Sequence, residues 1–238
     1  MQPEYLARLS RPVQQFILEV EEGAGLDISV VLDPRQNDAG PGGLGHLAVT
    51  IEAGRIQLFA PTNGYFPDGA VRHEVLHAHR FLIEGVPKLA LSDRVPWDKH
   101  FSDVLGSIDN ALEHVVIVPV ELNFHPERRE HWEAVMRTVC SDLPNIPEGE
   151  RRLAIGLHWT FLRHVLPDSP FVDIARSFAK KHALLEMADQ FADRFLSLST
   201  CKEELVRLLF LTFPEIPEHR ASLEYLNSAK GRFQTPIP

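Results

Sequence analysis

The chain has 238 residues and a mass of 26.9 kDa, which is enough for one large domain with a buried core. A hydrophobic content of 44% and a charged content of 24% are typical of globular proteins and exclude a disordered or collagen-like chain. The net charge of −9 argues against a nucleic-acid partner, because domains that bind nucleic acids present a basic surface to the phosphates.

Membrane segments and disulfide frameworks are also disfavoured. The longest apolar run, Val115 to Val120, is far shorter than the roughly 20 residues that span a bilayer. The first residues lack the basic and apolar regions of a secretion signal, so we expect a cytoplasmic protein without a membrane partner. Cys140 and Cys201 are too few for a disulfide scaffold, and we expect both to be reduced and structural.

The first part of the chain predicts a helix followed by strands. Residues 3–22 carry apolar side chains at spacings of three and four, which is typical of a helix, and Gly23 and Gly25 would end it. Three segments rich in apolar and β-branched residues predict strands: 27–32, 46–51 and 55–60. The last two flank the short connection Glu52-Ala53-Gly54 and therefore predict a hairpin.

The rest of the chain predicts helices, with prolines at or near their ends. The predicted helices are 69–84, 101–118, 127–141, 148–165, 169–197 with a break, and 201–213. The charged runs 127–131 and 180–182 predict solvated helical faces. We therefore expect the α+β class, with a β-containing region 1–126 and a helical region 127–238 packed on it.

The predicted helix 69–84 carries the motif His73-Glu74-Val75-Leu76-His77, an HExxH sequence. Positions i and i+4 share one helix face, so His73 and His77 could bind the same zinc ion. Neutral imidazoles suit zinc, and zinc lowers the pKa of a bound water to about 7. Glu74 lies next to the first histidine and would act as the general base that takes the proton of this water.

A catalytic zinc usually has three protein ligands, and the predicted helix 101–118 could supply the third. Its acidic residues Asp109 and Glu113 lie on one stripe with Asn110, on a helix otherwise rich in apolar residues. Burying such carboxylates is costly without a cation or hydrogen-bond partners. We therefore predict that Glu113 is the third ligand. Asp109 and His114 are alternative ligands, and Asp109 and Asn110 could instead support the ligands from behind.

The sequence HEVLH, followed 36 residues later by a helical glutamate, resembles the gluzincin class of zinc metallopeptidases. The resemblance covers residues 27 to about 122 and implies a zincin-like fold with one Zn²⁺ per chain. Small members of the class carry a Glu-x-x-Ala-Asn pattern on the second helix, whereas this chain has Asp109-Asn110-Ala111-Leu112-Glu113-His114. The longer metzincin pattern is absent, because Arg80 and Ile83 stand where its glycine and third histidine would be.

The resemblance also concerns how a substrate would bind. In gluzincins the strand before the active helix runs along the cleft and pairs with the substrate backbone. The resemblance would give this role to residues 55–60. A developing oxyanion would need a donor near the metal, and the candidates in the sequence are Tyr65, His79 and Arg80. Arg80 and Glu84 continue the face of the two histidines and are expected to pair with each other or with Asp109.

These residues predict a zinc-dependent metallopeptidase that acts on a peptide or protein substrate. One alternative is a metal-containing interaction or regulatory module in which Glu74 has no role. Another is a zinc hydrolase of a non-peptide amide, which would use the same water-activating residues.

Overall fold

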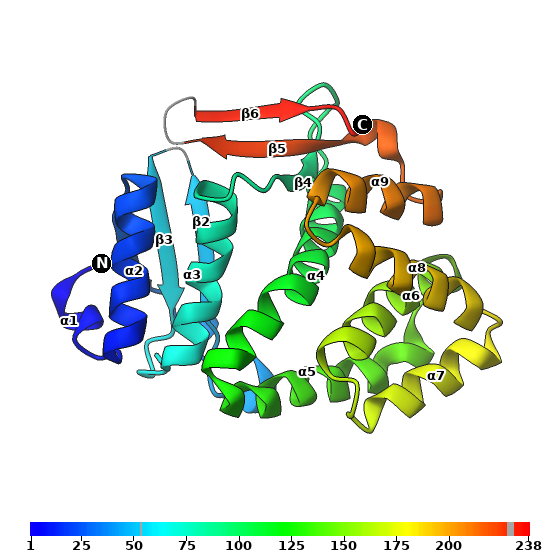
Figure 1. The fold of residues 1–238 in the computed structure, drawn as a ribbon, viewed down its shortest axis with the longest axis horizontal. Coiled ribbons are helices and arrows are strands. Elements are labelled where there is room, and N and C mark those ends of the chain that lie inside the picture. The colour runs from blue at the N-terminus through cyan, green and yellow to red at the C-terminus, as the bar shows by residue number, and fades with distance from the viewer. Residues whose placement is uncertain (53, 228–230) are drawn as a thin grey trace. The chain divides into compact units, whose positions relative to one another are not determined.

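The computed structural model describes residues 1–52, 54–227 and 231–238 and confirms the α+β class. Ala53, in the predicted hairpin connection, lies outside the described residues. In chain order, the helices and strands shown in Figure 1 are α1 (Pro3–Leu6), α2 (Arg11–Ala24), β1 (Ile28–Leu32), β2 (Ala48–Glu52), β3 (Arg55–Ala60), α3 (Asp68–Leu82), β4 (Lys88–Leu91), α4 (Lys99–Phe124), α5 (Arg129–Asp142), α6 (Glu148–Val165), α7 (Phe171–Lys181), α8 (Leu185–Leu198), α9 (Lys202–Thr212), β5 (Ala221–Asn227) and β6 (Gly231–Thr235).

The chain forms two compact units, and each draws on three stretches of the sequence. Unit 1 comprises residues 1–86, 120–131 and 225–233, and unit 2 comprises residues 87–119, 132–224 and 234–238. The helix α4 contributes to both units, because the division falls after Pro119. The predicted division at residue 126 falls within the second stretch of unit 1.

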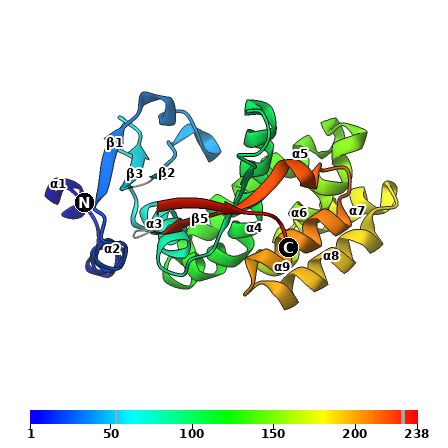
Figure 2. The same ribbon diagram turned by 90° about the horizontal axis from the view of Figure 1, so that it is seen from above.

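Unit 1 contains a three-stranded sheet in the order β1-β3-β2. The strand β3 pairs with β1 in parallel and with β2 antiparallel, with Val49 opposite Leu58. The helices α2 and α3 cover the same face of this sheet (Figure 2). The core between sheet and helices is made of Val13, Ile17 and Val20 of α2, Ile28 and Val30 of β1, Ile56 and Leu58 of β3, and Val71, Val75 and Ala78 of α3.

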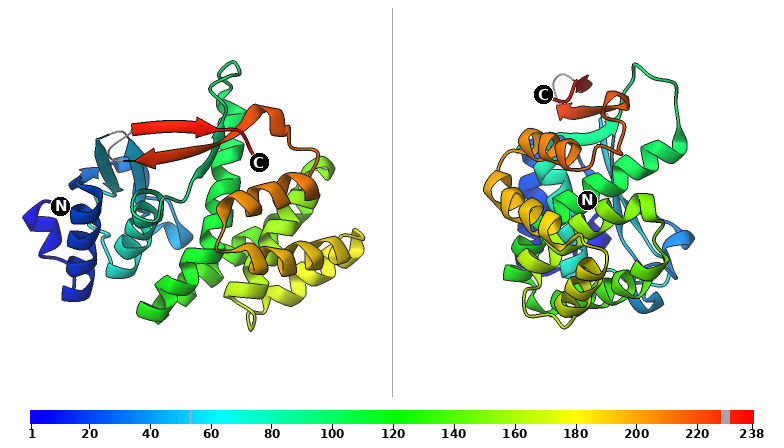
Figure 3. Two further views of the ribbon diagram at one scale, coloured as in Figure 1. Left: turned by 45° about the horizontal axis from the view of Figure 1, so that its top comes forward. Right: turned by 90° about the vertical axis from the view of Figure 1, so that its right-hand side faces the viewer.

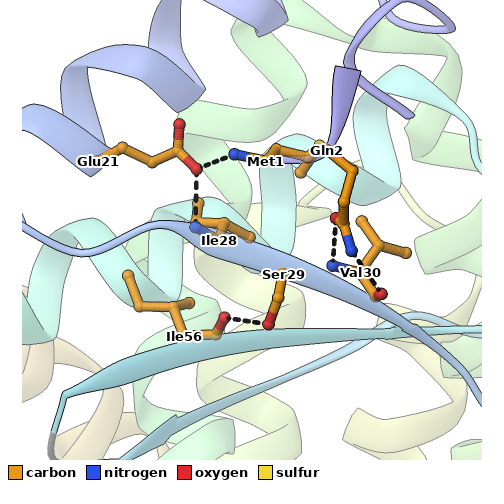
Figure 4. A network of polar contacts seen from close by, with 7 residues as sticks. All are labelled: Met1, Gln2, Glu21, Ile28, Ser29, Val30 and Ile56. Carbon is orange, nitrogen blue, oxygen red and sulfur yellow. Dashed lines mark hydrogen bonds and ion pairs between the residues drawn. The ribbon is translucent and has the colours of Figure 1, made fainter. Parts of the chain in front are cut away.

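The central position of β3 corrects the expectation that residues 55–60 could pair with a substrate. Both edges of β3 already have strand partners, so its backbone cannot accept a third. At the outer edge of β1, the side-chain amide of Gln2 accepts from the Val30 N–H at 2.8 Å and donates to the Val30 carbonyl at 3.1 Å (Figure 4). The outer edge of β2 is therefore the place in this sheet where an added strand could bind.

Unit 2 is mainly helical. The helices α6, α7, α8 and α9 pack on one another, and their colours in Figure 3 run from yellow-green for α6 to orange for α9. Within this unit, β4 pairs antiparallel with the first part of β5, with Lys88 opposite Glu224. The order of this second sheet is β4-β5-β6, and the division between the units falls within β5 and within β6. The sequence analysis predicted none of these three strands.

The helix α4 continues through Pro119 to Phe124, so the prediction that it ends at residue 118 is wrong. Proline inside a helix removes one backbone hydrogen bond and costs roughly 3 kcal/mol. The burial of Ile117 and Val118 just before it, and of Glu121 just after it, favours continuation of the helix.

Two smaller expectations concern cysteines and membranes. Cys140 and Cys201 are both free thiols, which confirms that they form no disulfide. Among the helices of the described residues, none combines the length and apolar character needed to cross a bilayer.

Candidate metal centre

The HExxH motif lies on α3, as predicted, and this helix is buried on all its faces from Gly69 to Ala78. Val71, Val75 and Ala78 form the apolar stripe that packs into the core of unit 1. Because this packing fixes the rotation of α3, the positions of the motif side chains are fixed as well.

His73 and His77 lie side by side on α3. They are 5% and 7% exposed, and their ring centroids are 5.0 Å apart in an edge-to-face arrangement. A ring nitrogen of each lies within 4.8 Å of one from the other. This spacing is suitable for two ligands of a single ion, because zinc binds imidazole nitrogens at about 2.0–2.1 Å.

His73 is oriented by a carboxylate that the sequence analysis did not identify. The Nδ1 atom of His73 lies 2.9 Å from Oε2 of Glu121, a residue of α4 that belongs to unit 1 and whose side chain is fully buried. A carboxylate can only accept, so Nδ1 carries the proton and Nε2 is the nitrogen with a lone pair for a metal. Burial lowers the pKa of His73 to about 3, with smaller contributions from Arg128, His131 and His46.

Glu74 is 8% exposed, and its Oε2 accepts a hydrogen bond from the Val49 N–H at 2.9 Å. Val49 lies on β2, so this contact joins the general-base candidate to the outer edge of the sheet. Burial raises the pKa of Glu74 to about 8, and the hydrogen bond from Val49 opposes this rise. At neutral pH a carboxyl with this pKa is mostly protonated, so the role of general base requires a nearby positive charge, such as a bound metal ion, that favours the carboxylate.

Arg128 neutralises the buried carboxylate of Glu121. Its Nε donates to Oε1 of Glu121 at 2.6 Å, and its Nη1 lies 3.5 Å from the hydroxyl of Tyr65. Arg128 is only 9% exposed, so the prediction that residues 127–131 form a solvated face is wrong at this position. The predicted oxyanion candidate Tyr65 is thus connected to His73 through two intervening side chains.

Tyr65 is held in place by a glycine. A Cβ atom built on Gly45 would lie 3.1 Å from Cβ of Tyr65, and Gly45 has a positive φ of 112°. Residues other than glycine rarely adopt this backbone conformation. Because Gly45 has no Cβ atom, Tyr65 can pack closely against its backbone.

The other two predicted oxyanion candidates, His79 and Arg80, pair with Glu84 near the C-terminal end of α3. Nδ1 of His79 lies 3.0 Å from Oε1 of Glu84, and Nη1 of Arg80 lies 3.0 Å from Oε2. The expected pairing of Arg80 with Glu84 is therefore present, and nothing in these contacts directs either side chain toward the histidines.

The predicted third ligand, Glu113, has a cation partner, but this partner is a lysine. Nζ of Lys202, on α9, lies 2.7 Å from Oε1 of Glu113 and 2.8 Å from Oδ1 of Asp109. Asp109 also accepts the Leu89 N–H at 2.9 Å. All three charged side chains are buried within unit 2, so the expected compensation of the acidic pair is supplied by the protein itself.

The remaining predicted ligands are Asn110, which is exposed, and His114, which is half-buried. The ring of His114 packs edge-to-face on Trp132, with 4.9 Å between the ring centroids. Within unit 1, His73 and His77 together offer two ligand atoms for a metal ion.

Two residues of the centre, Glu121 and Arg128, were missed by sequence reasoning. Glu121 follows directly on the apolar run that ends at Val120, and a lone charge in such a run is a signal of a buried, paired group. Arg128 stands among other charged residues, and only its burial in the structure distinguishes it from them. The sequence therefore gives no signal for its role comparable to that of Glu121.

Comparison of the chain with protein-family models, with curated proteins and with solved structures finds no match. Any function must therefore be inferred from the chemistry of the residues on α3 and around it.

Proposed function

We propose that this chain is a single-zinc metallopeptidase with a zincin-like centre on α3. The observation that carries the proposal is the buried HExxH motif in which Nδ1 of His73 lies 2.9 Å from Oε2 of Glu121. Imidazoles that are neutral and oriented by a carboxylate are the usual zinc ligands of proteins. The low pKa of His73 supports the neutral form that binding requires.

For the third ligand we choose His114 in place of Glu113. The carboxylate of Glu113 is engaged by Lys202. On the continuous helix α4, His114 comes seven positions before Glu121, which at about 100° per residue is nearly the same face. Glu113 lies about 100° away from His114 on this helix. We therefore propose His114, which the sequence left open as an alternative, as the third ligand beside His73 and His77.

Zinc held by three histidines supplies Lewis-acid chemistry, because it lowers the pKa of water and polarises a carbonyl. The role of Glu74 is to take the proton of the attacking water and deliver it to the leaving amine. Its Oε2 is fixed by the Val49 N–H, so the carboxylate has a defined orientation before any substrate binds.

The outer edge of β2 is the proposed substrate-binding strand. The N–H of Val49 points away from β3 and toward Glu74, so this edge runs past the general base. A peptide added to β2 would pair through its backbone, which gives affinity with little demand on sequence. Tyr65 could then donate its hydroxyl hydrogen to the carbonyl oxygen as negative charge develops there.

Elemental analysis of chelator-free protein tests the proposal together with a peptide-library assay. We expect about one zinc per chain in the wild type and in Glu74→Gln, and no stoichiometric zinc in His73→Ala. We expect Glu74→Gln to lower the hydrolysis rate by about 10² to 10⁴-fold. The matched control is Glu84→Gln, just after the same helix, which should retain zinc and hydrolysis.

Two results would contradict the proposal. Absence of zinc from the wild type after reconstitution would remove the metal site. Hydrolysis that survives Glu74→Gln would remove the assigned mechanism. Zinc binding with cleavage only of non-peptide amides would keep the site and the mechanism but reject the peptide substrate.

A further inference from the structure

A continuous series of polar contacts in unit 1 runs from Tyr65 to His73. The hydroxyl of Tyr65 lies 3.5 Å from Nη1 of Arg128, and Nε of Arg128 lies 2.6 Å from Oε1 of Glu121. The other oxygen of Glu121 lies 2.9 Å from Nδ1 of His73. Arg128 is thus the one residue in this series that contacts both the predicted oxyanion donor and the carboxylate behind the proposed zinc ligand.

The burial of these groups makes the arginine important. The side chain of Glu121 is 0% exposed and that of Arg128 is 10% exposed. A buried carboxylate needs hydrogen-bond partners for both oxygens, and here Nε of Arg128 donates to Oε1 while Nδ1 of His73 contacts Oε2. By holding Oε1, Arg128 therefore fixes the position of the carboxylate group that orients the ring of His73.

The fold reserves space for Arg128 against α3. A Cβ atom built on Gly69 would lie 2.6 Å from Cγ and 2.8 Å from Cδ of Arg128, which is closer than real contacts allow. Glycine at this position lets the stem of the arginine lie directly on the helix that carries the motif. Glycine inside a helix is otherwise less favourable than alanine, so its presence here is consistent with this close approach.

We propose that Arg128 is a positioning residue that sets both the affinity of the zinc site, through Glu121, and the placement of the Tyr65 hydroxyl. This inference rests on the proposed function. It extends that function by assigning one residue to two tasks, one on the metal side and one on the substrate side. It predicts that the two tasks can be separated by substitution.

The test measures zinc dissociation constants by competition with a chelator. Arg128→Gln should weaken zinc binding about 10 to 100-fold, the range seen when partners behind metal ligands are removed. Arg128→Lys keeps the charge but cannot bridge Glu121 and Tyr65 in the same way, so its effect on zinc should be smaller. Tyr65→Phe should leave zinc affinity unchanged and lower kcat.

A double-substitution cycle tests whether Arg128 acts through Glu121. If it does, Arg128→Gln combined with Glu121→Gln should weaken zinc binding no more than the stronger single variant. Additive losses would overturn the proposal, because they would mean that the arginine acts independently. A dissociation constant for Arg128→Gln within about twofold of the wild type would overturn it as well.

Gly69→Ala supplies a variant that keeps every polar group. The new methyl group would displace the stem of Arg128, so zinc affinity should fall severalfold, whereas an unchanged affinity would contradict the proposal. The matched control is Arg55→Gln, which removes an exposed arginine paired with Glu52 and should change nothing. Zinc affinity is measured without substrate, so a chain that binds zinc but cleaves no peptide would refute the peptidase proposal and the role given to Tyr65, and would leave the zinc-affinity part of this inference standing.

Discussion

The two parts of α4 both bury carboxylates, and they neutralise them in different ways. In unit 2, Asp109 and Glu113 share the single ammonium of Lys202. In unit 1, Glu121 is shared between the guanidinium of Arg128 and the imidazole of His73. The first cluster joins two helices and a strand end, whereas the second includes a histidine that could bind a metal.

The difference teaches that a buried carboxylate is not by itself evidence for a metal ligand. Its partner decides what the carboxylate does. Lysine is a compact point charge that can satisfy two acidic groups at once, which favours a structural ion cluster. A carboxylate that accepts from a histidine Nδ1 instead determines which ring nitrogen remains available for a metal.

Lys202→Met should produce the largest effect on stability. The substitution leaves Asp109 and Glu113 buried without their cation, and loss of one partner from a buried ion cluster costs about 3–5 kcal/mol. Urea unfolding at neutral pH would measure the change in the free energy of unfolding. The matched control is Lys99→Met, because Lys99 pairs with Asp103 at 2.7 Å but is 79% exposed.

The control should change the free energy of unfolding by no more than about 0.5 kcal/mol. Equal losses in the two variants would mean that burial does not distinguish Lys202. A second comparison replaces all three buried groups by apolar or neutral residues, as in Asp109→Asn, Glu113→Leu, Lys202→Met. This variant should recover part of the lost stability, because no uncompensated charge remains.

The same contrast explains what the sequence could and could not predict at the site. The motif on α3 was predictable, because its spacing and its apolar stripe depend only on neighbouring positions of one helix. The need of Asp109 and Glu113 for a cation was also predictable from their apolar surroundings. That the cation is Lys202 was not, because it lies 89 positions from Glu113 and only the tertiary fold brings the two together.

The fold shows the same division between local and distant information. The hairpin of β2 and β3 was predicted from adjacent segments with strong β patterns. The strands β4 and β5 were missed, because β4 has only four residues and its partner β5 begins 130 positions after its last residue. Short segments of this kind become strands when the rest of the fold provides a pairing edge.

Neighbouring substitutions on α4 sharpen the comparison at the level of zinc binding. His114→Ala removes a proposed ligand and should weaken zinc binding at least about 100-fold. Its free energy of unfolding should stay near the wild-type value. Glu113→Gln should retain zinc binding but lower the free energy of unfolding by about 1.5–3 kcal/mol, because it weakens the contact with Lys202. Zinc dissociation constants and urea unfolding of both variants would provide the data.

The opposite pattern would restore the original ligand assignment. If Glu113→Gln lost zinc and His114→Ala retained it, Glu113 would be a ligand in spite of Lys202. The adjacent positions make this comparison strict, since both variants change the same turn of the same helix.

The third and smallest contrast is the response to acid, which concerns one half-buried histidine in each unit. Burial lowers the pKa of His158, in unit 2, from 6.5 to about 4. Burial likewise lowers the pKa of His131, in unit 1, to about 4, where Arg128 lowers it further and Glu121 opposes the shift. Between pH 6.5 and 4 the unfolded state binds a proton that the folded state does not, so stability falls as the pH falls.

Each of these histidines should contribute a slope of up to about 1.4 kcal/mol per pH unit in this window and almost none above pH 7. His158→Gln should flatten the pH dependence of unfolding measured at pH 7, 6 and 5. His131→Gln should flatten it as well, but by an amount that changes when Arg128 is replaced, because Arg128 contributes to the shift. The effect of each histidine substitution on the pH dependence of unfolding is then measured again in the presence of Arg128→Gln. If Arg128→Gln changed both effects equally, the charges around Glu121 would not specifically influence His131, and this contrast between the two histidines would fail.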